Sequence, residues 1–123
     1  MKRVQYEYII NTTKLILYEK ISTAKGLQNW FADMVTIEND YFIFTWNKNS
    51  STAIIKKVEL SSVSIFWKDE KAKSPLKLEI FYHELTNDLA LLITDYYDDD
   101  ETEIKDFWDL SITKLKRIIG DVK

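Results

Sequence analysis

The sequence predicts an α+β fold: a seven-stranded antiparallel sheet curved around a long C-terminal helix, with two short helices between strands 1 and 2. Three observations support this prediction. A segment with strand-like alternation opens the chain, six further alternating segments follow one another without a helix between them, and the C-terminal segment carries an apolar stripe at helical spacing. That stripe has no other large apolar surface to cover than the sheet.

A single domain spanning 1–123 is predicted, because the chain is long enough for one hydrophobic core and no repeat or composition shift divides it. Hydrophobic residues make up 46% of the sequence, with only two glycines and one proline, which favours an ordered fold over a linker. Cysteine is absent, which excludes disulfides, thiol catalysis and cysteine zinc sites.

Charge and hydropathy restrict the partners. Gln5 and Glu7 interrupt the segment after the basic start, so no signal-peptide core forms, and no apolar run is long enough for a membrane span. A cytoplasmic location is therefore expected. The net charge of −3 and the scattered lysines and arginines argue against a nucleic-acid partner.

The first strand is predicted from the alternation of two sets of residues, Val4, Tyr6, Tyr8 and Ile10 on one face and Gln5, Glu7 and Ile9 on the other. Asn11-Thr12-Thr13 can cap a short helix over 14–20, and Ser22 or Thr23 can cap a second helix that runs to about Phe31. The break between the two helices predicts a V and not a single rod.

Turn-forming residues divide the middle of the chain into six predicted strands. The strands are 34–38, 41–47, 52–60, 63–68, 76–84 and 89–97, and residues 69–74 form a longer loop between two of them. Since no helix intervenes, consecutive antiparallel pairing is expected, which together with the first strand makes a seven-stranded meander.

The C-terminal helix begins near Glu101. Its apolar stripe consists of Ile104, Trp108, Leu115, Ile119 and Val122. The acidic run 98–101 is predicted to cap this helix through Asp99 or Asp100 and to interact with its dipole. A calcium loop would need spaced oxygen ligands and commonly a glycine, so no metal site is predicted.

The segment Gly26-Leu27-Gln28-Asn29-Trp30-Phe31-Ala32-Asp33, with the order of elements around it, resembles the START-like helix-grip superfamily. The resemblance is closest to the branch of heat-shock ATPase activator homologues and polyketide cyclase-like proteins. It implies a cavity between the curved sheet and the C-terminal helix, which in that family often holds an apolar ligand. Trp30-Phe31 corresponds to the family's aromatic pair before the second strand, and Trp108 with Leu115 to helix positions that face the sheet.

The aromatic content is high, with four tryptophans, seven tyrosines and six phenylalanines. These rings either fill a wide gap between sheet and helix or also line a pocket. Ser111 lies on the apolar stripe of the last helix, where a small side chain leaves space or bonds its own preceding turn. The candidate ligand-binding residues are Trp46, Trp67, Tyr82, Trp108, Ser111 and Leu115. No catalytic residue and no cofactor is predicted, and His83 should face away from Tyr82.

Three functions remain open. The first is a non-enzymatic module that binds an apolar or amphipathic small molecule. The second is a co-chaperone-like interaction protein or homodimer, because the other sheet face carries apolar residues: Tyr41, Ile43, Phe66, Phe81 and Leu92. The third is a cyclase-like enzyme that uses a pocket residue such as Tyr82 or Asp95.

Overall fold

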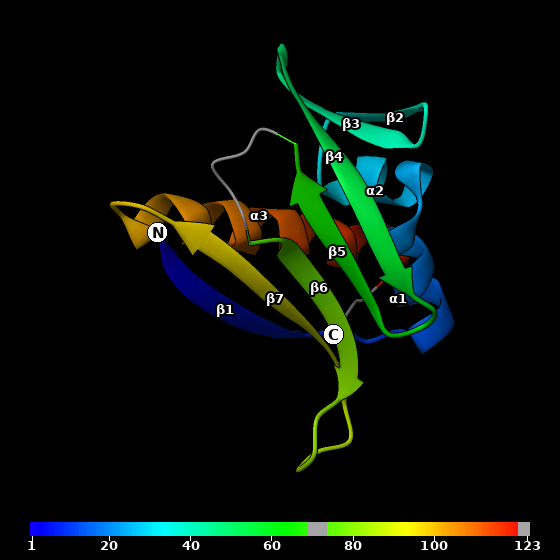
Figure 1. Cartoon of the computed structure of the whole chain (residues 1–123). Coiled ribbons are helices and arrows are strands. Elements are labelled where there is room, and N and C mark those ends of the chain that lie inside the picture. The colour runs from blue at the N-terminus through cyan, green and yellow to red at the C-terminus, as the bar shows by residue number, and fades with distance from the viewer. Residues whose placement is uncertain (69–73, 121–123) are drawn as a thin grey trace.

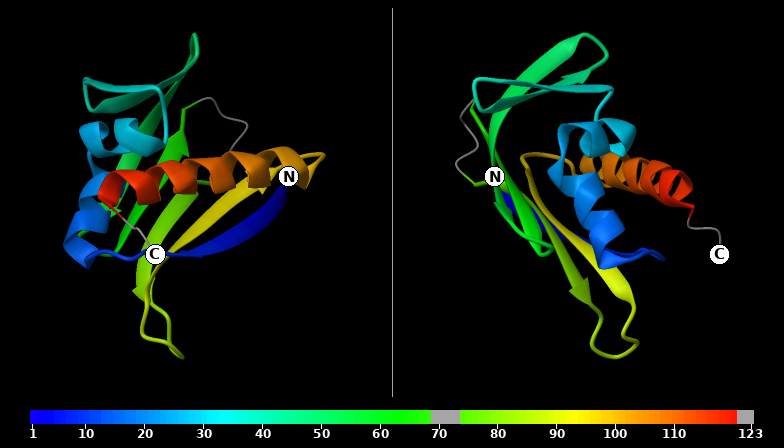
Figure 2. Two further views of the ribbon diagram at one scale, coloured as in Figure 1. Left: turned by 180° about the vertical axis from the view of Figure 1, so that it is seen from behind. Right: turned by 90° about the vertical axis from the view of Figure 1, so that its right-hand side faces the viewer.

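A curved sheet and three helices form two layers in the computed structural model, which describes residues 1–68 and 74–120 (Figure 1). The elements in chain order are β1 (Lys2–Ile9), α1 (Lys14–Ser22), α2 (Ala24–Trp30), β2 (Met34–Glu38), β3 (Tyr41–Trp46), β4 (Asn49–Val58), β5 (Ser62–Trp67), β6 (Leu76–Tyr82), β7 (Leu89–Tyr97) and α3 (Glu101–Ile119). All three helices lie on the same side of the sheet (Figure 2). The predicted fold class is therefore confirmed. Residues 69–73 of the predicted loop and Val122 of the predicted stripe lie outside the described residues.

The sheet has the strand order β1-β7-β6-β5-β4-β3-β2, and every neighbouring pair is antiparallel. Strands β2 to β7 form the predicted meander. The first strand departs from it, because the two helices after β1 carry the chain across the sheet and leave β1 beside β7 instead of β2. The two edges of the sheet are consequently β1 and β2.

The predicted strand 52–60 differs from the structure at both ends. Strand β4 begins at Asn49, which pairs with Trp46 of β3, and it ends at Val58. The turn consists of Asn47 and Lys48 alone. Asn47 has a φ of 55°, a conformation that asparagine tolerates better than most residues, and its backbone N–H donates to Asp33 Oδ2 over 2.6 Å.

Thr23 joins α1 to α2. It ends α1, and its side-chain Oγ1 accepts a hydrogen bond of 2.9 Å from the backbone N–H of Gly26, which makes it the N-cap of α2. Gly26 is buried at this junction, where a Cβ would lie 2.8 Å from Lys20 Cα. The predicted break between two short helices is confirmed, and a glycine lets them approach.

The core fills the space between the concave face of the sheet and the helices. Phe44, Val63, Ile65, Leu78 and Ile93 from the sheet are fully buried. Trp108 and Leu115 are their fully buried counterparts on α3. The carboxylate of Asp100 accepts from the backbone N–H of Thr102 over 2.9 Å and caps α3, whereas Gly120 in the left-handed conformation ends it.

Candidate functional site: a hollow between the sheet and the C-terminal helix

An aromatic cluster lies where the end of α2 meets α3 and the sheet. Phe31 is at its centre, with its ring stacked on Trp108 (centroids 5.5 Å apart) and edge-on to Trp46 (5.3 Å) and Phe107 (6.0 Å). The indole N–H of Trp46 donates to the backbone oxygen of Phe31 over 2.8 Å, which fixes the end of β3 to the segment after α2. Trp67 adjoins Trp46 with centroids 6.3 Å apart.

These rings border a hollow of about 270 Å³, here called the inner hollow. Its lining residues are Phe31, Trp46, Trp67, Leu76, Asp95, Phe107 and Trp108. They come from the α2–β2 connection, from four strands or strand ends of the sheet, and from α3. The hollow therefore lies between the sheet and the C-terminal helix, in the position that the resemblance implied.

Asp95 is the one ionisable side chain among the described residues that line the inner hollow. It lies on β7 and accepts two hydrogen bonds, from the Trp108 indole N–H to Oδ2 over 3.0 Å and from the Tyr96 backbone N–H to Oδ1 over 2.8 Å. Burial raises the pKa of the Asp95 carboxyl above its ordinary value, although both hydrogen bonds act in the opposite direction. A carboxyl group thus lies in a largely apolar, aromatic environment.

Two further hollows adjoin the inner one. The outer hollow, about 440 Å³, lies between the segment 28–33 and α3 and includes Trp46, Phe107, Ser111 and Lys114 in its lining. The acidic hollow, about 470 Å³, is lined by Tyr96, Tyr97, Asp98, Asp99, Asp100, Glu103, Ile104 and Phe107. Phe107 belongs to all three linings, so its ring borders all three hollows.

The six candidate residues do not all gather at one place. Trp46, Trp67 and Trp108 meet at the inner hollow, while Ser111 lines only the outer one. Leu115 is fully buried in the core and lines neither. Tyr82 lies at the end of β6, 49% exposed, with the Lys14 ammonium 5.1 Å from its ring centroid.

Four residues that line the inner hollow were not among the candidate ligand-binding residues: Phe31, Leu76, Asp95 and Phe107. Leu76 has the same side-chain parity as Leu78, which was the available signal for a residue on the inner face. Phe107 lies at the flank of the helical stripe, where periodicity does not distinguish a core position from a cavity wall. Asp95 has the parity of the buried Ile93 and the opposite parity to Leu92, so alternation already predicted it on the inner face, where it was considered only for a cyclase-like reaction.

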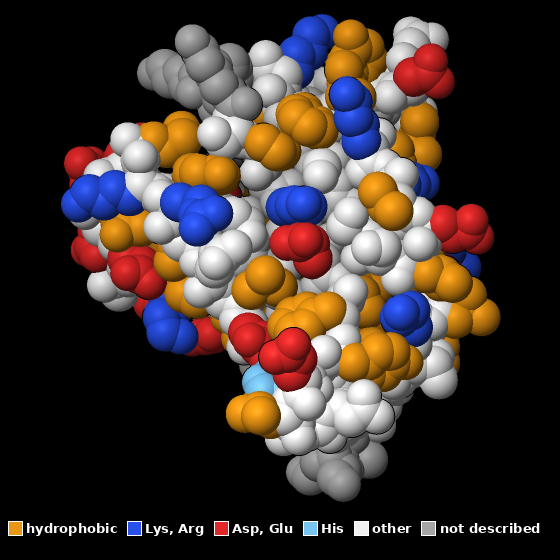
Figure 3. All heavy atoms as spheres, turned by 60° about the horizontal axis from the view of Figure 1, so that its bottom comes forward, with side chains coloured by type: hydrophobic (Ala, Val, Ile, Leu, Met, Phe, Trp, Pro, Cys, Tyr) orange, Lys and Arg blue, Asp and Glu red, His pale blue; other side chains and the backbone are white. Residues whose placement is uncertain are grey.

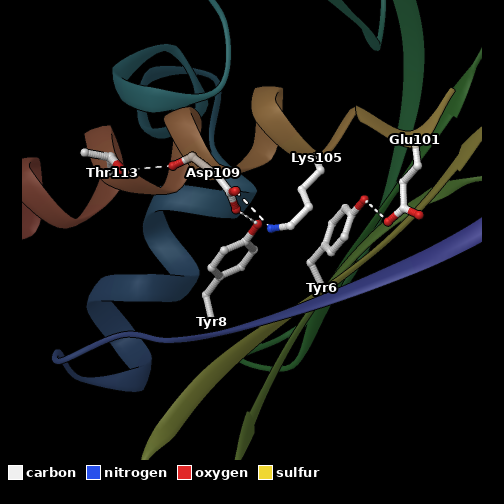
Figure 4. Close-up of polar contacts among 6 residues, drawn as sticks. All are labelled: Tyr6, Tyr8, Glu101, Lys105, Asp109 and Thr113. Atoms are coloured by element: carbon white, nitrogen blue, oxygen red, sulfur yellow. Dashed lines mark hydrogen bonds and ion pairs between the residues drawn. The ribbon is translucent and has the colours of Figure 1, made fainter. Parts of the chain in front are cut away.

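A second polar arrangement attaches α3 to the edge strand β1 (Figure 4). The Tyr6 hydroxyl donates to Glu101 Oε2 over 2.7 Å, and the Tyr8 hydroxyl donates to Asp109 Oδ1 over 2.8 Å. Lys105 lies between them, with its ammonium 2.9 Å from Asp109 Oδ2 and 5.4 Å from the Tyr6 ring centroid. Burial, followed by the hydrogen bond to the nearby carboxylate, raises the pKa of both tyrosines. These contacts hold α3 over the sheet.

The outer face of the sheet mixes apolar and charged side chains (Figure 3). Phe66 and Tyr41 are partly exposed, and the ammonium groups of Lys56 and Lys68 lie 5.4 Å and 4.7 Å from their ring centroids. His83 lies on this side, 3.6 Å from Glu7, as expected from its parity. Within the described residues, no helix is long and apolar enough to cross a membrane.

Comparison with known proteins agrees with this geometry. Residues 1–121 match the model of the START-like superfamily domain, so the chain belongs to the START-like superfamily. A protein from Bacteroides fragilis, solved by NMR, is 32% identical over 95% of this chain and 90% of its own, with a TM-score of 0.62. No curated protein matches the sequence.

Two more distant structures share the fold alone. The Aha1 dimer from Colwellia psychrerythraea is 12% identical, with 97% of this chain and 96% of that chain covered and a TM-score of 0.72. DynU16, a putative protein in the dynemicin biosynthetic locus, is 11% identical with a TM-score of 0.74, and the match covers 96% of this chain and 47% of that chain.

Proposed function

We propose that this START-like domain binds a small apolar or amphipathic molecule in the inner hollow. The observation that carries the proposal is an aromatic hollow between sheet and helix whose walls are not closed over: Trp46, Trp67 and Phe107 are all partly exposed. Ligand sites are mostly apolar with a few polar groups, and this lining has one, Asp95. At about 270 Å³ the hollow is near the lower end of ligand-site volumes, which favours a molecule of one or two rings.

Native mass spectrometry of freshly purified protein tests the proposal directly. We expect a retained adduct or, if purification strips it, stoichiometric binding of an apolar fluorescent probe that changes tryptophan emission. Leu76→Phe should lower probe affinity, because Leu76 lines the inner hollow and a larger side chain fills it. Ser111→Phe is the matched control, since it places the same ring in the outer hollow.

The two variants separate the possibilities. Overpacking typically costs about 1–3 kcal/mol, so thermal melts establish that each variant is folded before binding is compared. Loss of binding in Ser111→Phe alone would move the ligand site to the outer hollow, which Ser111 lines. Absence of any adduct and of any probe binding in the wild-type protein would overturn the proposal.

A protein-interaction function is the second candidate. It is favoured by apolar side chains on the outer face and on the edge strand β2, where Ile54, Met34 and Ile37 are 45%, 53% and 54% exposed. The distant Aha1 structure is a dimer, which makes self-association of this chain worth testing. The same native mass spectrum counts subunits, and Ile54→Lys should dissociate a dimer built on the outer face.

A cyclase-like reaction has less support. General acid–base chemistry commonly uses a pair of positioned polar groups, and Asp95 is the single ionisable residue in the described lining of the inner hollow. Tyr82, the other residue considered for this role, does not line that hollow.

A further inference from the structure

Asp95 distinguishes the inner hollow from a simple apolar cavity. The Trp108 indole N–H and the Tyr96 backbone N–H both donate to the Asp95 carboxylate. Hydrogen bonds of this kind stabilise the ionised form of a carboxyl group. An ionised carboxylate has about four lone-pair sites, so two bonds leave acceptor capacity. A ligand that donates hydrogen bonds can use the remaining acceptor sites of Asp95.

The carboxylate has no cationic partner in the part of the chain that the structure describes. The ion pairs there join other residues, and none includes Asp95. Asp95 is half-buried, and partial burial of a carboxylate without a cationic partner is costly, which is the main cause of the raised pKa of Asp95. A bound cation would compensate for it.

The rings around Asp95 suit the same ligand. Trp46, Trp67, Phe107 and Trp108 line the hollow together with the carboxylate. The faces of tryptophan and phenylalanine attract organic cations, and they equally bury apolar carbon. Recognition of an ammonium group by an aromatic enclosure and a carboxylate is therefore chemically favourable here.

One of the two adjoining hollows carries the same sign of charge as Asp95. The neighbouring acidic hollow shares Phe107 with the inner one and is lined by Asp98, Asp99, Asp100 and Glu103. Acidic side chains near a site raise the local concentration of cations and lower that of anions.

We infer that the inner hollow selects a small organic cation, an ammonium or amidinium group on an aromatic or aliphatic body, whose charge pairs with Asp95 while the rings enclose the body. This inference rests on the proposed function and specifies its ligand class. A neutral amphipathic molecule would use the rings alone, and an anion would be repelled by the carboxylate.

Three probes with one body test the charge. They are 1-naphthylmethylamine, 1-naphthalenemethanol and 1-naphthoate, titrated into the wild-type protein by calorimetry at neutral pH. We expect the amine to bind at least tenfold more tightly than the alcohol, and the naphthoate to bind more weakly than both. Added salt should weaken binding of the amine and leave binding of the alcohol almost unchanged. Indole N–H signals in NMR spectra locate the probe, because the Trp108 N–H bonds Asp95 whereas the Trp30 N–H bonds the Lys20 backbone oxygen.

Asp95→Asn should abolish the preference for the amine while retaining binding of the alcohol. Asp106→Asn is the matched control, because it removes the same charge from an exposed position on α3 that lines none of the three hollows. Equal affinity of wild-type protein for amine and alcohol would overturn the inference and leave the proposed function standing. Failure of all three probes to bind would overturn the inference, and together with the absence of a retained adduct and of binding by the apolar fluorescent probe it would overturn the proposed function as well. The comparison of probes on the wild-type protein decides between these outcomes even where Asp95→Asn fails to fold.

Discussion

The indole ring of Trp108 lies nearly parallel to the ring of Phe31, with centroids 5.5 Å apart and an interplanar angle of 17°. Phe31 directly follows α2, and Trp108 lies in the middle of α3, so the stacked pair connects the two helical parts of the fold. Both side chains are almost completely buried. An aromatic pair of this kind contributes about 0.5–1.5 kcal/mol beyond the burial of its surface.

Trp108→Ala should unfold the domain or severely destabilise it. Removing a large aromatic side chain from a core costs about 3–5 kcal/mol, a large share of the total stability of a small domain. Thermal unfolding followed by circular dichroism measures the loss. Leu110→Ala on the same helix is the control, because Leu110 is 63% exposed and its removal should change the melting temperature little. A Trp108→Ala protein that melts within a few degrees of wild type would contradict this prediction.

Gly26→Ala should destabilise the junction of α1 and α2. Alanine normally favours a helix over glycine, but here the added Cβ would lie 2.8 Å from both Lys20 Cα and Thr23 Oγ1. Since Lys20 Cα belongs to the backbone, the two helices must separate, and we expect a loss of about 1–3 kcal/mol in the free energy of unfolding. Urea denaturation provides the measurement. Lys25→Ala, at the neighbouring position, should change stability by less than about 0.5 kcal/mol, and an equal effect of the two substitutions would show that the junction adapts.

The sequence predicted the element order, the inner face of the strands and the α3 stripe, because alternation and helical periodicity report burial directly. It did not place β1 next to β7, since local pattern carries no information on which distant strand completes a sheet. For the candidate site, too, local patterns predicted which side chains face inward but not how distant segments pack against one another. Trp46, Trp67 and Trp108 line the inner hollow because alternation and helical periodicity place all three on the inner face, whereas Ser111, about one turn further along α3, lines only the outer hollow.

Tyr8→Phe should lower the free energy of unfolding by about 1 kcal/mol, because it removes the hydrogen bond from β1 to Asp109 of α3. Tyr6→Phe should cost less, since its bond to Glu101 is exposed to solvent. Tyr18→Phe serves as the control, as the Tyr18 hydroxyl forms no hydrogen bond within the described residues. Chemical denaturation of the three variants under one condition ranks their free energies of unfolding. If Tyr8→Phe were as stable as Tyr18→Phe, the hydrogen bond from Tyr8 to Asp109 would not contribute to holding α3 on the sheet.

The same tyrosines predict a weakening at alkaline pH. Their folded pKa values are raised above the ordinary value of 10.0, so the native state retains their protons more tightly than the unfolded chain. Their contribution is fully present below about pH 10 and is lost as the pH rises through the folded pKa values. The stability difference between wild type and the Tyr6→Phe/Tyr8→Phe double variant should therefore shrink above about pH 10. A difference that stays constant with pH would contradict the pKa shifts.

Asp95→Asn should change the acid side of the stability profile. The folded pKa of Asp95 is raised above its ordinary value of 3.8 by burial, so the folded protein binds this proton more tightly than the unfolded chain. The stabilisation that comes from the tighter binding of the Asp95 proton is fully present below the ordinary pKa of 3.8. This stabilisation is lost as the pH rises through the pKa of Asp95 in the folded protein. Relative to Asp95→Asn, wild type should consequently gain stability as the pH falls from about 7 to about 4. Urea denaturation of both proteins at each pH isolates Asp95, because groups with the opposite trend, such as Asp109 with its lowered pKa, contribute equally to both. A wild-type protein that instead loses stability relative to the variant over this range would show that the Trp108 and Tyr96 hydrogen bonds outweigh burial.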